Sequence, residues 1–319
     1  MVLLISGLII ISLLLGTILW RFLNWRKALI RKLNQNSVVL ETEKGPIEYC
    51  IHGSNGDYVL FLHGAPGGYD QYGIHRNPFF ARYRVIAISR FGYLRTPLST
   101  AMNLPDQADA IAAFLDALNI NKIIVSAGSG GGPLALAFAA YHPDRVSRMV
   151  LYAVASQAMD LDDNRPGVKI LKAISRSDFL SWLLLVRLMR KPEKLVGMLI
   201  KDPSHRQHIM ASGQAEQFAQ AMSVMLPPSL RIQGMDNDEK IFKFLDIPKH
   251  LITAPTLILH GDQDEHVAYE QSRRLQQQLP NSRLVTIEGG DHFMGYTHSD
   301  LLERHYREFF NPSDSTVLG

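Results

Sequence analysis

The stretch that decides the fold reads Ile124-Val125-Ser126-Ala127-Gly128-Ser129-Gly130-Gly131-Gly132-Pro133. It begins as an apolar strand, passes through a glycine-rich turn, and ends with a proline, which suits the first turn of a helix. A sharp strand-to-helix turn needs small residues two before and two after its apex, because larger side chains would collide there. Ala127 and Gly131 meet this need around Ser129. The stretch therefore predicts a tight turn that presents a serine between a buried strand and a helix.

Nucleotide-binding proteins also place a glycine-rich turn between a strand and a helix. A Walker A loop is excluded because no Gly-Lys-Ser/Thr follows the turn. A dinucleotide-binding fingerprint would put its third glycine at Pro133, and the next predicted strand ends at Leu151–Val154 without an acidic residue. Both departures disfavour a nucleotide site.

Short β-branched runs alternate with helical patterns on both sides of this turn. We expect the first two strands to form a hairpin and the remainder to form a mostly parallel sheet with helices on both faces. The predicted strands are Val38–Glu43, Ile47–Ile51, Tyr58–Leu62, Arg84–Ser89, Lys122–Ser126, Arg148–Val154, Thr256–His260 and Arg283–Glu288. The predicted helices of this part are Asp106–Leu118, Pro133–Tyr141, Tyr269–Leu279 and Ser299–Phe310.

The turn at Ser129 resembles the nucleophile elbow of the α/β-hydrolase family, with alanine in place of the first glycine of G-x-S-x-G. In that family an acid and then a histidine follow the serine, each on a loop after a later strand. Here Gly261-Asp262-Gln263-Asp264 follows one late strand and Gly289-Gly290-Asp291-His292 follows the next. The resemblance implies that Ser129 is the nucleophile, Asp264 the acid and His292 the base.

A third motif, His63-Gly64-Ala65-Pro66-Gly67-Gly68, directly follows the strand Tyr58–Leu62. It resembles the oxyanion loop of the same family. The resemblance implies that the backbone N–H groups of Ala65 and Gly130 bind the oxyanion and that His63 supports the loop. The segment Ser89–Tyr93 also resembles a loop of the family, but we assign it no catalytic role.

Asp262, Asp264 and His266 alternate in a way that metal ligands sometimes do. No other cluster of ligand residues accompanies them, so we interpret them as parts of the acid loop and expect no metal. The single cysteine, Cys50, excludes an internal disulfide framework. The mechanism implied by the resemblance requires no cofactor.

The N-terminal twenty residues, Met1 to Trp20, contain no charged side chain and are rich in leucine and isoleucine. At 1.5 Å per residue, about 20 residues span the roughly 30 Å hydrocarbon core of a bilayer. A cleaved signal peptide would carry basic residues before the apolar run and a small-residue cleavage site after it. Only the α-amine precedes the run and Arg21-Phe22-Leu23 follows it, which favours a retained membrane anchor.

Basic residues cluster directly after this apolar run, at Arg21, Arg26, Lys27, Arg31 and Lys32. The chain has a net charge of +3, and without these five residues it carries 28 basic against 30 acidic side chains. The folded part therefore lacks the positive excess of a nucleic-acid surface, and no nucleic-acid partner is expected. The positive-inside rule places the basic flank in the cytoplasm and predicts a single-pass membrane protein with a cytoplasmic catalytic domain.

The strand pattern is interrupted between Gln157 and about His250, where amphipathic stretches predict a helical cap. Seven of the eleven methionines fall there. Two interpretations stay open: the methionines line a lipophilic pocket, or they pack the cap against itself. The predicted organisation begins with a transmembrane anchor at residues 1–20 and a basic juxtamembrane linker at 21–37. An α/β-hydrolase core follows in two segments, 38–156 and 251–312, with the cap between them at 157–250.

The sequence thus predicts a membrane-anchored serine hydrolase that cleaves a carboxylic ester, with a lipophilic acyl compound as its small-molecule substrate. Two alternatives stay open. A proline-iminopeptidase-like aminopeptidase is similar in its His-Gly-x-Pro-Gly loop, and it would need cap carboxylates such as Glu193, Glu216 or Asp236 to bind an α-amine. A ligand-binding receptor with low turnover uses the same fold. The sequence does not indicate an oligomeric state.

Overall fold

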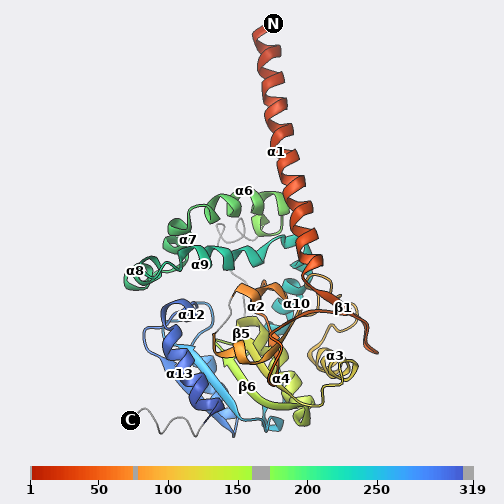
Figure 1. Cartoon of the computed structure of the whole chain (residues 1–319), viewed down its shortest axis with the longest axis vertical. Helices are drawn as coiled ribbons and strands as arrows, with labels where there is room; N and C mark the ends of the chain where they lie inside the picture. The colour runs from red at the N-terminus through yellow and green to blue at the C-terminus, as the bar shows by residue number, and fades with distance from the viewer. Residues whose placement is uncertain (1, 75–77, 160–172, 312–319) are drawn as a thin grey trace.

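An eight-stranded sheet forms the centre of the computed structural model, which describes residues 2–74, 78–159 and 173–311 (Figure 1). The strand order is β1-β2-β4-β3-β5-β6-β7-β8; β2 pairs antiparallel with both β1 and β4, and all other pairs are parallel. The predicted hairpin and mostly parallel sheet are therefore confirmed. The strands are β1 Val38–Leu40, β2 Ile47–His52, β3 Tyr58–Leu62, β4 Arg84–Ile88, β5 Ile123–Gly128, β6 Val146–Tyr152, β7 Thr256–Gly261 and β8 Ser282–Ile287.

The first strand is shorter than the sequence predicts, because the chain turns early. β1 ends at Leu40, whereas the β-branched pattern extends to Glu43. The Thr42 hydroxyl donates to the Gly45 carbonyl at 2.7 Å, and the Gly45 N–H donates back to the Thr42 carbonyl at 3.0 Å. A threonine that bonds its own turn in this way competes with strand pairing.

Helices cover both faces of the sheet, and each face has its own apolar cluster. One cluster joins the sheet to α3 and α4, and the other joins it to α13 and to the last turns of α1. Alternate residues of β3 separate the two: Leu60 and Leu62 belong to the first cluster and Val59 to the second. The helices outside the cap are α1 Val2–Gln35, α2 Asp70–Ile74, α3 Leu104–Ala117, α4 Gly132–Tyr141, α11 Glu270–Gln278, α12 Met294–Thr297 and α13 Ser299–Phe310. Short 3-10 turns are η1 Pro78–Arg82, η2 Ser129–Gly131, η3 Pro143–Arg145, η4 Ser223–Met225, η5 Pro228–Leu230 and η6 Lys249–Leu251.

In its described part, the insertion between β6 and β7 contains helices, turns and loops but no strand, and it lies over the carboxyl ends of the strands (Figure 1). Residues 160–172 of the predicted cap lie outside the described residues. The methionines do not gather at one place: Met222 is buried in the cap's apolar cluster, whereas Met198 and Met210 are exposed. The cap helices are α6 Asp178–Met189, α7 Pro192–Leu199, α8 Pro203–Ala211, α9 Ala215–Met222 and α10 Ile232–Lys243.

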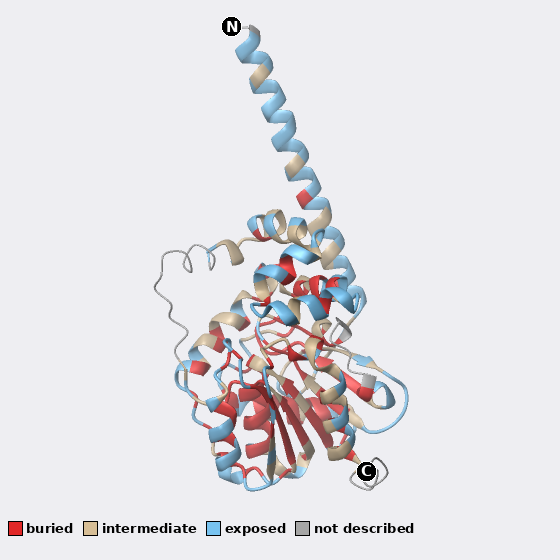
Figure 2. Ribbon diagram, turned by 90° about the vertical axis from the view of Figure 1, so that its left-hand side faces the viewer, coloured by how far each residue is buried: buried red, intermediate tan, exposed pale blue. Residues whose placement is uncertain are grey.

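The N-terminal helix α1 projects from the folded domain, with its N-terminus far from the sheet (Figures 1 and 2). By length and composition it can cross a membrane, and none of its most apolar window is buried, unlike the core helix of a soluble protein. Residues 21–35, predicted to be a linker, continue the same helix without a break. The last turns of α1 are anchored to the domain, where Leu33 is buried and its carbonyl accepts a 2.6 Å hydrogen bond from the Tyr69 hydroxyl.

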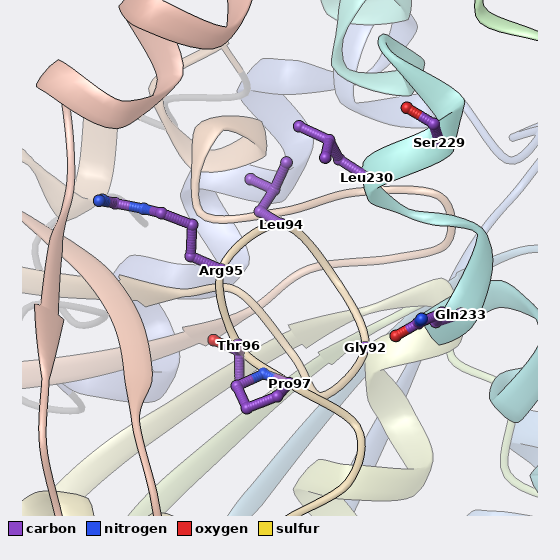
Figure 3. Close-up of a pocket in the computed structure, with 8 residues that line it drawn as sticks. All are labelled: Gly92, Leu94, Arg95, Thr96, Pro97, Ser229, Leu230 and Gln233. Carbon is purple, nitrogen blue, oxygen red and sulfur yellow. The ribbon is translucent and has the colours of Figure 1, made fainter.

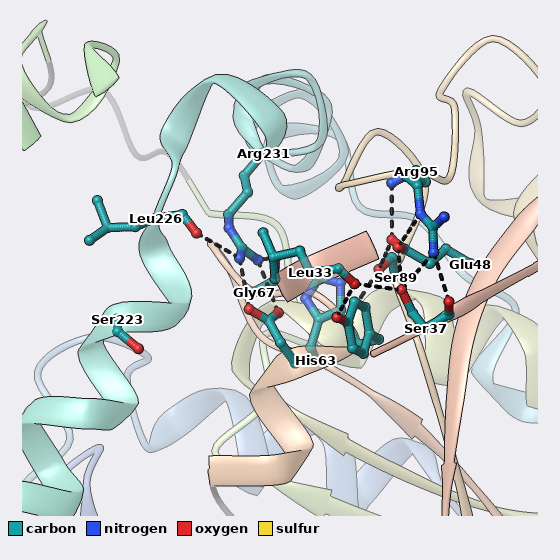
Figure 4. Close-up of polar contacts among 12 residues, drawn as sticks. Leu33, Ser37, Glu48, His63, Gly67, Ser89, Arg95, Ser223, Leu226 and Arg231 are labelled. Atoms are coloured by element: carbon teal, nitrogen blue, oxygen red, sulfur yellow. Dashed lines mark hydrogen bonds and ion pairs between the residues drawn. The ribbon is translucent and has the colours of Figure 1, made fainter. Parts of the chain in front are cut away.

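A polar network holds Ser37, two residues after the end of α1. Arg95 donates to Glu48 at 2.6 Å and to the Ser37 hydroxyl at 2.7 Å, and Ser37 in turn donates to Glu48 at 2.7 Å (Figure 4). Glu48 is fully buried and also accepts from Ser89 at 2.8 Å. Because a buried carboxylate needs all of these donors, the exit of α1 is fixed relative to β2 and β4.

We expect Cys50 to be unreactive in the folded protein. Burial, together with the nearby carboxylates Asp70 and Glu48, raises the pKa of its thiol to about 12. Because only the thiolate reacts, alkylation at pH 8 should be about 10³-fold slower than for an unperturbed cysteine of pKa about 8.5. Intact-mass time courses with iodoacetamide in native buffer and in denaturant measure the ratio. Equal rates in the two solutions would contradict this expectation.

Candidate active site

The turn around Ser129 is as tight as the sequence predicts. Ser129 has φ = 49°, a left-handed backbone value that a residue other than glycine rarely adopts unless the surrounding structure enforces it. A Cβ added to Gly131 would lie 2.4 Å from the Leu62 carbonyl oxygen, so only glycine fits two residues after the serine. β5 ends at Gly128 and α4 begins at Gly132, which places Ser129 at the carboxyl end of a central strand.

Three side chains from three loops form a hydrogen-bonded chain. Asp264 follows β7 and His292 follows β8, and both loops open at the same edge of the sheet as Ser129. His292 Nδ1 lies 2.7 Å from Asp264 Oδ2, and His292 Nε2 lies 3.1 Å from Ser129 Oγ. An ionised carboxylate only accepts, so Nδ1 carries the proton and Nε2 is free to accept from the serine hydroxyl. This geometry suits proton transfer from a serine to a histidine.

The carboxylate of Asp264 is buried, and both of its oxygens accept hydrogen bonds. Its Oδ1 accepts from the N–H groups of His266 and Val267 at 2.8 and 2.9 Å, and His260 Nε2 lies 3.2 Å from Oδ2. Burial by itself raises the pKa of Asp264, but the hydrogen bonds from His260 and His292 outweigh it and hold the pKa well below its ordinary value. Asp264 is therefore ionised at neutral pH, as an orienting acid must be.

We expect this carboxylate to make the folded protein sensitive to acid. A depressed pKa in the folded state stabilises the protein fully above about pH 5, and the stabilisation is lost as the pH falls toward the folded-state pKa. Asp264→Asn should therefore unfold at lower urea concentration than wild type at pH 7, and the difference should shrink toward pH 3. The exposed Asp144→Asn is the control. A constant difference between wild type and Asp264→Asn at every pH would contradict the assignment.

The predicted oxyanion loop borders the serine. A Cβ added to Gly130 would lie 3.1 Å from the Ala65 nitrogen, and one added to Gly64 would lie 3.1 Å from Ser129 Cβ. Among the described residues, the Ala65 N–H donates no backbone hydrogen bond. The two predicted donors, Ala65 and Gly130, therefore lie next to one another, and the loop that carries Ala65 borders Ser129.

A histidine and an arginine hold the predicted oxyanion loop through hydrogen bonds. The fully buried His63 receives a 2.9 Å hydrogen bond at Nε2 from the Arg90 N–H and donates through Nδ1 to the Gly64 carbonyl at 2.7 Å. Burial, together with the positive charge of Arg90, holds the pKa of His63 well below its ordinary value. His63 is therefore a neutral support of the loop rather than a base.

A contact that the sequence analysis missed joins this loop to the cap. Arg90, in the segment to which we assigned no catalytic role, forms a bidentate ion pair with Asp238 of α10 at 2.7 and 2.6 Å. The Tyr93 hydroxyl donates to the same carboxylate at 2.6 Å, and Arg90 Nε donates to the His63 carbonyl at 2.8 Å. The segment after β4 thus connects the cap to the oxyanion loop.

A second buried arginine makes a similar connection. Arg231, which directly precedes α10, donates to the Gly67 carbonyl at 2.6 Å and to Asp70 at 2.8 Å (Figure 4). It also donates to the Leu226 carbonyl at 3.0 Å. No sequence signal marked Arg231. All of these partners except Leu226 lie more than 160 positions away in the chain.

The metal alternative can be tested against this geometry. Ligand atoms of Asp264, His266 and His292 lie within 4.8 Å of one another, as they would around an ion. Both oxygens of Asp264, however, already accept hydrogen bonds, and the His266 ring lies against the His292 ring at 4.9 Å. Asp262 turns away and accepts from the Gly289 N–H at 2.8 Å. The donor set therefore fits a hydrogen-bonded acid and base better than a metal site.

A surface pocket of about 280 Å³ lies at the junction of the segment after β4 with the cap (Figure 3). Its lining residues are Gly92, Leu94, Arg95, Thr96, Pro97, Ser229, Leu230 and Gln233. None of them belongs to the hydrogen-bonded chain, so this pocket is separate from Ser129.

Comparison with known proteins agrees with this fold. A sequence profile of the alpha/beta hydrolase fold matches residues 57–299. The chain belongs to the alpha/beta hydrolase family. An alpha/beta hydrolase fold protein from Nakamurella multipartita is 32% identical, with a TM-score of 0.77 over 86% of this chain and 98% of that one.

Two curated relatives of this hydrolase indicate the kind of chemistry. A putative esterase/lipase of Haemophilus influenzae is 22% identical, covering 86% of this chain and 92% of that protein. A 2-hydroxy-6-oxononadienedioate/2-hydroxy-6-oxononatrienedioate hydrolase of Burkholderia vietnamiensis is 26% identical, covering 82% and 90%. Such relatives support a hydrolase that acts on a small molecule, and they leave its substrate unspecified.

Proposed function

We propose that this hydrolase is a membrane-anchored serine esterase that cleaves a lipophilic acyl ester. The observation that carries the proposal is the hydrogen-bonded chain from Ser129 through His292 to Asp264. His292 takes the Ser129 proton, Oγ attacks the acyl carbon, and the N–H groups of Ala65 and Gly130 bind the oxyanion. His292 then protonates the leaving alcohol and activates a water molecule that hydrolyses the acyl-enzyme.

Apolar side chains beside the proposed machinery support a lipophilic acyl group. The Phe242 ring of α10 approaches to 3.3 Å from where a Cβ on Gly130 would lie. The Phe293 ring, next to His292, packs edge-on against Phe218 of α9 at 5.3 Å. An acyl chain bound at Ser129 would therefore lie close to the aromatic carbon of Phe242, with a second aromatic ring beside His292.

The packing of α1 supports a retained anchor over a cleaved signal peptide. Phe22 is buried only two residues after the uncharged run, and Arg26 pairs with Asp178 of the cap at 2.6 Å. A signal peptide needs an accessible cleavage segment at this point. Intact-mass analysis of the protein extracted from membranes tests this, since the anchor reading requires the whole chain including Met1–Trp20.

The aminopeptidase alternative finds less support. Of the three candidate carboxylates, Asp236 pairs with Arg176, and Glu193 and Glu216 are exposed. The relative from Burkholderia vietnamiensis adds a 2-hydroxy-6-oxononadienedioate as a compound to assay beside the esters. A panel of acyl esters of rising chain length, aminoacyl amides and a dienoate therefore separates the possibilities.

The decisive experiment is labelling of the detergent-solubilised full chain with a fluorophosphonate, followed by intact-mass analysis. We expect one adduct on wild type and none on Ser129→Ala. An adduct that persists in Ser129→Ala would place the reactive group elsewhere. A folded wild-type protein that takes no label and hydrolyses no member of the panel would favour the low-turnover receptor.

A further inference from the structure

The cap helix α6 is apolar over most of its circumference yet is scarcely buried. Of its twelve residues only Ser181 is buried. Leu180 and Leu184, one turn apart, are each 42% exposed. A helix that is apolar on all sides normally lies within a core or in lipid, and an exposed apolar patch on a folded domain marks an interaction site.

This helix lies against α1, on the side of the cap that faces the projecting N-terminus (Figure 1). Phe22 of α1 packs against Phe179 and Trp182 of α6, with ring centroids 5.2 and 5.6 Å apart. Trp25 lies 6.2 Å from Trp182, and Arg26 pairs with Asp178. The start of α6 is therefore fixed to one short segment of α1.

That segment lies at a defined depth relative to the proposed anchor. Phe22 and Trp25 come two and five residues after Trp20, the last residue of the uncharged run. At 1.5 Å per residue they lie about 3 to 8 Å beyond the end of the hydrocarbon-spanning segment. The polar headgroup layer is about 5 to 7 Å thick on each side of a bilayer. An anchor that spans the bilayer with residues 1–20 would therefore place the start of α6 at the depth of the headgroups.

The charges at the far end of α6 are those that such a surface attracts. Arg187 lies in the last turn of α6 and Arg190 and Lys191 directly follow the helix. Lys194 lies in α7 beside the single acid Glu193, and all five residues are exposed. Arg187 continues the stripe of Leu180 and Leu184 by one more turn. Apolar residues with flanking basic residues on one helix are typical of helices that lie in the interface of an anionic membrane.

We propose that α6 lies in the headgroup layer of an anionic phospholipid bilayer and is a second membrane contact beside α1. The inference rests on the proposed membrane anchor. It follows that the cap is held against the bilayer surface and that the domain has one fixed orientation, with α6 facing the lipid.

Site-directed spin labelling of the full chain tests this proposal. The label is placed by Leu184→Cys in a Cys50→Ser background, and the protein is reconstituted into vesicles of phosphatidylcholine and phosphatidylglycerol at equimolar ratio. Gln277→Cys, at an exposed position of α11, is the aqueous control, and Leu13→Cys in the apolar run is the lipid control. Power saturation compares collisions of each label with oxygen and with a water-soluble nickel chelate.

We expect the label at position 184 to favour oxygen over the nickel chelate, as at position 13, and the label at 277 to favour the chelate. Arg187→Glu with Lys191→Glu should lower the oxygen preference at position 184 severalfold. A label at 184 that behaves like the one at 277 overturns the inference, while lipid exposure at 13 still upholds the anchor. Shielding at 184 from both reagents with spin–spin broadening would indicate a second copy of the chain instead, and this also overturns it.

Discussion

His292→Ala is expected to lower kcat for ester hydrolysis by on the order of 10⁵- to 10⁶-fold, because the serine loses the base that takes its proton. Its Nε2 is 3.1 Å from Ser129 Oγ, within reach for proton transfer. Since residues of such a chain act as a unit, Ser129→Ala combined with His292→Ala should cost little more than either change alone. Steady-state kinetics with a short-chain ester measure each variant.

A matched control lies beside the proposed base. The His266 ring stacks at 4.9 Å from the His292 ring, but Asp264 accepts from the His266 backbone N–H rather than from its imidazole. Burial, together with His292, lowers the pKa of His266, so its imidazole is neutral at pH 7. We expect His266→Ala to retain kcat within about tenfold, the range of an indirect packing effect. Equal losses in the two variants would leave the choice of base unsupported.

The site could be predicted from sequence wherever its chemistry is encoded locally. The turn at Ser129 is marked by its own neighbours in the chain, because small residues surround the serine and Pro133 lies in the first turn of α4. Asp264 and His292 each stand directly after a strand that the apolar pattern reveals. The strand Tyr58–Leu62 and the helix Ser299–Phe310 were predicted with the bounds that the structure has. In these cases a short stretch of sequence contains the signal that predicts the element or the position of the site residue.

Contacts between distant segments could not be predicted in this way. Arg90 and Asp238 are 148 residues apart, and Arg26 and Asp178 are 152 apart. Nothing in the amphipathic pattern of α10 distinguishes Asp238, which is buried, from Asp236 two residues earlier, which lies at the surface. Which carboxylate turns inward depends on how the cap sits on the core, and that is a property of the packed structure.

This difference within α10 leads to the largest expected effect on stability. Asp238→Ala should lower the free energy of unfolding by about 3 to 5 kcal/mol, because it leaves the Arg90 guanidinium buried without its partner. The two side chains are only 4% and 6% exposed. Asp236→Ala removes the partner of Arg176 on the same helix, where both side chains are about 40% exposed, and should cost about 0 to 1 kcal/mol. Urea unfolding at pH 7 gives both values.

A paired replacement separates the loss of the ion pair from the cost of an orphaned charge. Arg90→Met with Asp238→Leu removes both charges and should recover part of the stability that Asp238→Ala loses, since apolar pairs can substitute for buried ion pairs. The paired variant still lacks the Arg90 hydrogen bond to the His63 carbonyl, which lies below the oxyanion loop. Its fluorophosphonate labelling should therefore slow by less than the roughly 10² to 10³ that removal of one oxyanion donor costs. A paired variant no more stable than Asp238→Ala would show that the orphaned Arg90 charge carries no such burial penalty. A paired variant labelled as fast as wild type would show that the ion pair does not position the oxyanion loop.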